Sequence, residues 1–150
     1  MDKKNWWKEQ PLLISAVQTT KGDSNWTLED YVVKNGFNTE QLLHLFGDGY
    51  ITTFFPQRDE QNLTEYLKKS RKHGIREIIY VNTHVLDLET SKNHPSWCQI
   101  TKDGTPKVMY QIYSGVCVNP KGDFHKDFLK KLESLCKLDI DGIFMDGPVM

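Results

Sequence analysis

The sequence predicts an α/β fold in which parallel strands alternate with helices, and three observations support that prediction. Short apolar runs recur at residues 12–17, 75–81 and 142–145, and each is typical of a strand buried within a parallel sheet. Helical patterns lie between them, and two of these patterns end at a glycine. Alternation of this kind implies parallel strands joined by helical crossovers. The chain has 150 residues, which suits one domain.

The first two strand–helix units come from the N-terminal third of the chain. Residues 12–17 (LLISAV) form a nearly continuous apolar run, which predicts a strand buried on both faces. Thr27 is the candidate N-cap of the first helix, and Gly36 ends it. Residues 39–46 have helical propensity, but the run is short and stops at a Gly-Asp-Gly turn. We therefore predict a second strand there.

The second half of the chain supplies the clearer elements. Leu63, Tyr66 and Leu67 share a helical face before Gly74, and a third strand is predicted over residues 75–81. A connection without regular structure is expected over residues 82–122, and a connection of that length is usually functional or disordered. Within it, Asp87 and Glu89 are expected to start a short helix.

A third helix and a fourth strand complete the pattern. Asp123 is the predicted cap of the helix. The apolar stripe expected on this helix comprises Phe124, Phe128, Leu132, Leu135 and Cys136. The fourth strand covers residues 142–145, with Asp146 at its carboxyl end. Asp139 and Asp141 precede this strand and are interpreted as solvated turn residues.

Two architectures fit this order of elements, a barrel and an open doubly wound sheet. A glycine-rich phosphate loop after the first strand would favour the open sheet. The sequence has only Gly22 among polar residues at that position. The composition excludes other classes: the net charge is −1, with 38% hydrophobic and 26% charged residues. It gives no case for binding nucleic acid or membrane. Three widely spaced cysteines form no disulfide framework and fit a reducing, cytoplasmic compartment.

Ligands of parallel α/β folds bind where the strands end. That rule selects Gln18, Thr19, residues 44–49, residues 82–87 and Asp146. Asp146 directly follows an apolar strand and precedes Gly-Pro, so its carboxylate could serve glycosidic chemistry or could simply cap a turn. No histidine or cysteine spacing indicates a metal site, and no cofactor is expected.

An ordered set of motifs resembles a known family. The set comprises HPSW at 94–97, DGTP at 103–106, CVNP at 117–120 and DGIFMDGP at 141–148, preceded by matching pieces at 7–19 and 72–76. The chain resembles the N-terminal part of hypothetical glycosyl hydrolase family six, barrel proteins distantly similar to α-L-fucosidases, α-amylases and β-galactosidases. The resemblance implies a partial (β/α)8 TIM barrel of about four strand–helix units, with residues 1–150 as its N-terminal half.

The resemblance also implies roles for individual residues and a carbohydrate substrate. Asp146 stands at the position of the catalytic nucleophile, and Asn82, His84, Trp97 and Asn119 are the candidate sugar-site residues. Trp97 could stack on a sugar ring or plug the rim of the barrel.

The resemblance leaves the barrel incomplete. A complete barrel has eight units in about 250 residues, and glycoside hydrolysis needs two carboxylates. We therefore expect the acid/base to be missing from this chain. Its missing half would come from a C-terminal half or from a second copy in a homodimer. A non-catalytic carbohydrate-binding or assembly module, or an inactive fragment, is the alternative.

Overall fold

The main feature of the computed structural model is a parallel four-stranded sheet, within the described residues 5–8, 10–15, 28–42 and 57–147. Its strands are β1 (Ile14–Ser15), β2 (Thr39–Leu42), β3 (Arg76–Asn82) and β7 (Gly142–Asp146). They lie in the order β1-β2-β3-β7, so each new strand joins the edge left by the previous one. A doubly wound sheet instead reverses direction at a switch point. The parallel α/β prediction is confirmed, and the order is that of part of a barrel.

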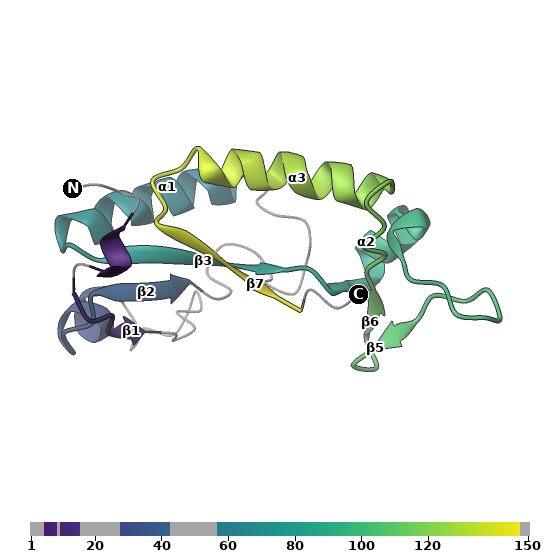
Figure 1. The fold of residues 1–150 in the computed structure, drawn as a ribbon, viewed down its shortest axis with the longest axis horizontal. Helices are drawn as coiled ribbons and strands as arrows, with labels where there is room; N and C mark the ends of the chain where they lie inside the picture. Colours follow the sequence, from purple (N-terminus) through teal and green to yellow (C-terminus); the bar gives the residue numbers. More distant parts are fainter. Residues whose placement is uncertain (1–4, 9, 16–27, 43–56, 148–150) are drawn as a thin grey trace.

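Two long helices cover the same face of this sheet (Figure 1). Helix α1 (Gln57–Lys72) connects β2 to β3, and α3 (Asp123–Cys136) lies between β3 and β7 in the chain. Gly74, at the end of α1, has a φ of +72°, the left-handed conformation expected at a helix stop. One stretch of π-helix (Leu28–Val33) stands where the first helix was predicted, and its candidate cap Thr27 lies outside the described residues.

The hydrophobic core fills the space between the sheet and these helices. Ile79 and Val81 alternate along β3 toward the helices, as a strand with one face on the core requires. From α3, Phe124, Phe128 and Leu135 are buried against them. Two details of the predicted helix are wrong: Gly122 rather than Asp123 occupies the cap position, and Cys136 is exposed.

The opposite face of the sheet carries exposed apolar side chains. Ile14 of β1 is 43% exposed and Phe144 of β7 is 45% exposed. The prediction that the first strand is buried on both faces is therefore wrong for the described residues. The helices cover one face only, and Trp6, on the short 3₁₀ turn η1 (Trp6–Lys8), packs over Arg76 at the start of β3. In a closed barrel this face would line the interior.

The long connection after β3 is a small substructure, contrary to the expectation that it lacks regular structure. It contains β4 (Val85–Leu86), α2 (Leu88–Asn93), a 3₁₀ turn η3 (Pro95–Trp97), β5 (Val108–Met109) and β6 (Tyr113–Gly115). Strands β4, β6 and β5 form an antiparallel sheet in that order. Asp87 caps α2 by accepting hydrogen bonds from the backbone N–H groups of Glu89 and Thr90, which confirms the predicted short helix. Figure 1 shows this substructure beyond the carboxyl end of β3.

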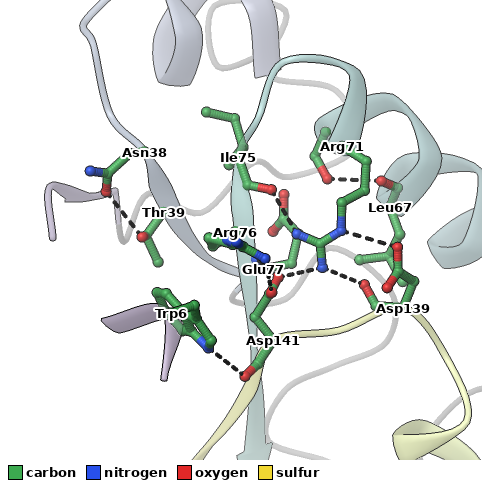
Figure 2. A network of polar contacts seen from close by, with 11 residues as sticks. Trp6, Asn38, Thr39, Leu67, Arg71, Ile75, Arg76, Glu77, Asp139 and Asp141 are labelled. Atoms are coloured by element: carbon green, nitrogen blue, oxygen red, sulfur yellow. Dashed lines mark hydrogen bonds and ion pairs between the residues drawn. The ribbon is translucent and has the colours of Figure 1, made fainter. Parts of the chain in front are cut away.

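Asp141 lies at the centre of a buried charge network at the other end of the strands (Figure 2). Its side chain is fully buried and accepts hydrogen bonds from Arg71, from Arg76 Nη1 at 2.9 Å and from the backbone N–H of Glu77 at 2.9 Å. The interpretation of Asp141 as a solvated turn residue is therefore wrong. Asp139 is half exposed and pairs with Arg71 at 3.1 Å. The network connects α1 to β3 and to the start of β7.

Candidate active site

Asp146 lies at the carboxyl end of β7, beside the carboxyl end of β3. Its Cα is in register with that of Asn82, and Phe144 is in register with Tyr80. Residues in register on parallel strands point to the same side, so Asp146, Asn82 and Tyr80 share the face away from the helices. This is the face that lines a barrel, at the end where barrel active sites are found.

Tyr80 and Thr83 hold Asp146 in place. The Tyr80 hydroxyl donates to Asp146 Oδ2 at 2.5 Å. Thr83 donates twice to the Asp146 carbonyl, from its backbone N–H at 3.1 Å and from Oγ1 at 2.8 Å. The carboxylate is thus fixed both through its own oxygen and through its backbone. A fixed carboxylate at the strand end is what attack on, or stabilisation of, an oxocarbenium-like centre requires.

Asn82 shapes the turn that follows β3. It is buried, its Oδ1 accepts from the backbone N–H of His84 at 3.0 Å, and its Nδ2 donates to the Val85 carbonyl at 3.0 Å. The amide therefore organises the chain between β3 and β4, as Asx side chains do in turns. The consequence is a defined position for His84 next to the end of β7.

The His84 side chain lies between the backbone that follows Asp146 and Tyr110 of the inserted substructure. A Cβ added to Gly147 would lie 2.3 Å from His84 Nδ1, so the imidazole rests directly on the backbone after Asp146. On its other side, His84 Nε2 is 3.2 Å from the Tyr110 hydroxyl, and the two rings meet edge to face. The structure therefore brings Asp146, Asn82 and His84 together and adds Tyr80 and Tyr110.

Replacing Gly147 with alanine should displace the His84 side chain and destabilise the fold. Gly147 has a φ of +65°, and the new methyl group would collide with the His84 ring. We expect a loss of about 1–2 kcal/mol of folding free energy from the backbone conformation alone, plus displacement of His84. Gly104→Ala is the matched control, because Gly104 has a φ of +83° with no atom within 4 Å of an added Cβ. Urea unfolding of both variants measures the difference, and equal losses would contradict the contact with His84.

Trp97 and Asn119 lie in other surroundings. Trp97 is only 7% exposed, His94 stacks on its ring at 4.0 Å between centroids, and Phe124 meets it edge-on. Of the two roles considered for Trp97, this packing favours the plug over sugar stacking. Asn119 is exposed, and its Oδ1 accepts from the backbone N–H of Lys121 at 3.0 Å in the turn before α3. Its role in a sugar site stays a prediction.

Tyr80 and Tyr110 escaped the sequence analysis for different reasons. Tyr80 lies inside a predicted strand, and the period-2 rule would have placed it on the same face as Asn82. Tyr110 lies between two strands of two and three residues, too short for any periodicity. The candidates Gln18, Thr19 and residues 44–49 lie outside the described residues.

Within the described part of the chain, no cluster of three or more histidine, cysteine or acidic side chains could hold a metal ion. Across the same residues, no helix has the length and apolar character needed to cross a membrane.

Comparison with known proteins shows what the chain is similar to. The family described as hypothetical glycosyl hydrolase 6 matches residues 40–147. No curated protein matches the sequence. Among solved structures, the galactosidase domain of the α-galactosidase-sucrose kinase AgaSK superposes with a TM-score of 0.66 at 15% identity, over 89% of this chain and 20% of that one.

Two further structures have the same fold at low identity. They are the GH36 α-galactosidase AgaA of Geobacillus stearothermophilus in complex with stachyose (TM-score 0.66, 17% identity, 92% of this chain) and the Bacillus licheniformis trehalose-6-phosphate hydrolase TreA (0.58, 12%, 93%). The chain spans 21% of the first and 35% of the second. The described part of the chain thus has the fold of part of a TIM barrel.

Proposed function

The chain belongs to the hypothetical glycosyl hydrolase 6 family, and from that premise we propose that it forms part of a catalytic barrel acting on glycosidic bonds, with Asp146 as the nucleophile. The observation that carries the proposal is the position of Asp146 at the carboxyl end of β7, on the inner face, held by Tyr80. Glycosidases place a carboxylate against the anomeric carbon in this way. Asn82 supports the turn beside it, and His84 lies against the backbone that follows it.

The acid/base is proposed to come from outside this chain. Hydrolysis needs a second carboxyl group about 5–5.5 Å from the first for retention, or about 6.5–9.5 Å for inversion. Further strand–helix units, arranged after β7 around the same barrel axis, would bring such a group to the same rim. Residues 1–150 would then be the N-terminal half of one domain.

Asp146→Asn tests the assignment of the nucleophile. The amide keeps the size of the side chain and can still accept from Tyr80, but it lacks the charge that attacks or stabilises the anomeric centre. In the longest expressed form of the protein we expect kcat on p-nitrophenyl α-galactoside or α-glucoside to fall on the order of 10³-fold or more, with an unchanged melting temperature. Asp123→Asn, an exposed acid at the start of α3, is the control. Undiminished turnover by the Asp146 variant would refute the assignment.

A non-catalytic half-barrel that binds carbohydrate or assembles with another half is the second candidate. The exposed Ile14 and Phe144 on the inner face favour it, since an apolar sheet face of this kind calls for a cover. We expect the 150-residue chain to form a dimer in light scattering, with one cooperative melt, as two halves close a barrel. A stable monomer with a cooperative melt would argue against self-assembly.

A reducing, cytoplasmic compartment is proposed as well. Cys98, Cys117 and Cys136 are all free thiols, and Cys136 is exposed. Exposed thiols persist where glutathione and thioredoxin keep them reduced.

A further inference from the structure

We propose that Tyr110 is the aromatic platform on which a sugar ring stacks beside Asp146, and that His84 is the residue that positions it. The inference rests on the proposed function, because it assigns the sugar-contacting surface of the same site. It replaces Trp97, which the core covers, with Tyr110, an aromatic residue that is 67% exposed.

The contacts from Asp146 to Tyr110 are continuous. Gly147, the residue after Asp146, packs under the His84 ring. The His84 ring then meets Tyr110 through the 3.2 Å contact between Nε2 and the hydroxyl, with ring centroids 5.8 Å apart at 83°. Tyr110 is 67% exposed with this contact in place, so much of its phenol ring is open to solvent. An open aromatic ring, linked through His84 to the backbone that follows Asp146, suits the apolar face of a pyranose.

The backbone at Tyr110 indicates that an aromatic side chain is kept there at a cost. Tyr110 and Gln111 have φ values of +50° and +69°, at the tip of the β5–β6 hairpin. Two consecutive positive φ angles favour glycine, asparagine or aspartate in a hairpin turn. A bulky residue in this conformation is strained, and such strain persists where the surroundings and function maintain it. If Tyr110 had a structural role, replacing it with a residue that tolerates a positive φ would lower stability. If it has a binding role, the same replacement would weaken binding without lowering stability.

The test compares ligand binding with thermal stability in variants of Tyr110. We would measure binding of two iminosugars, 1-deoxygalactonojirimycin and 1-deoxynojirimycin, by calorimetry with the longest expressed form of the protein. Tyr110→Asn relieves the backbone strain, so we expect an equal or higher melting temperature together with about tenfold weaker binding, because the stacking contact is lost. Tyr110→Phe keeps the ring and should bind within about threefold of the wild type.

A double-mutant cycle tests the positioning role of His84. Tyr110→Ala and His84→Ala should each weaken binding about tenfold, and the double variant should lose little more than either single variant, since both act through one platform. Additive losses would overturn the role of His84.

The outcomes distinguish the two proposals. If Asp146→Asn weakens iminosugar binding but Tyr110→Asn and Tyr110→Ala do not, the platform is refuted and the proposed function stands. If the wild-type protein binds neither iminosugar and cleaves no p-nitrophenyl glycoside, both are refuted.

Discussion

The folded chain should lose stability steadily as the pH rises from about 4.5 to about 9, because two buried carboxyl groups resist ionisation. Glu40 of β2 and Glu77 of β3 are in register on the helix-facing side of the sheet, and both are fully buried. Burial raises the pKa of Glu40 to about 7, partly offset by the hydrogen bond that Tyr66 donates to Oε2 at 2.6 Å. Burial, and then the neighbouring Glu40, raise the pKa of Glu77 to about 9.

The direction follows from proton linkage. Both groups bind a proton more tightly in the folded chain than in the unfolded chain, where each titrates near pH 4.5. Below that pH both states are protonated, and the two groups cause no loss of stability. Above it the unfolded chain releases protons that the folded chain retains, so the free energy of unfolding falls until Glu40 ionises at about pH 7 and Glu77 at about pH 9. The total loss is on the order of several kcal/mol, a large part of the roughly 5–15 kcal/mol typical of a domain.

Glu77→Gln isolates the larger contribution. The amide cannot ionise, so the variant should be more stable than the wild type at pH 8, with a smaller difference at pH 5 and a flatter pH profile between them. Urea midpoints measured at half-unit pH intervals give the comparison. Glu65→Gln on the exposed face of α1 is the control and should leave the profile unchanged. A wild-type stability that is flat from pH 5 to 8 would contradict the buried pair.

The sequence predicted β3 and β7 well because each of these strands is marked by an apolar run of its own. The apolar run at 75–81, which directly follows Gly74, marked β3 to within one residue at each end, and residues 142–145 gave all but the last residue of β7. The inserted substructure had no such signal, since β4, β5 and β6 have two or three residues each.

In the candidate site, too, residues marked by their local sequence could be predicted, and residues placed by long-range contacts could not. Asp146 could be placed at the strand end from its neighbours in sequence alone, and the register with Asn82 follows from adjacent parallel strands. The contact of His84 with Tyr110 spans 26 residues and depends on how the hairpin folds back. Trp97 was ambiguous because a tryptophan in a loop can be covered or open, and only the packing of His94 and Phe124 decides it.

Among single substitutions at the amino ends of the strands, Asp141→Ala should be the most destabilising. We expect it to lower the free energy of unfolding by about 3–5 kcal/mol. Asp141 makes ion pairs with both Arg71 and Arg76, whose side chains are 23% and 16% exposed. Removing the carboxylate leaves two largely buried guanidinium groups without this partner and removes the acceptor for the Glu77 backbone N–H. Arg71 keeps its pair with the half-exposed Asp139, but a buried charge that loses its buried partner costs more than the original pair contributed.

Asp139→Ala is the matched control for that substitution, because Asp139 pairs with the same Arg71 but its side chain is 52% exposed. An exposed ion pair contributes about 0–1 kcal/mol, so this variant should unfold close to the wild type. Urea unfolding at pH 5, where the Glu40–Glu77 pair contributes least, separates the two effects. Arg71 lies on α1, Arg76 on β3 and Asp141 directly before β7. A large difference between the variants would therefore mean that one buried carboxylate fixes the helix to the sheet. Similar losses of stability in the two variants would mean instead that core packing alone holds α1 against the sheet, and that the buried ion pairs contribute little to stability.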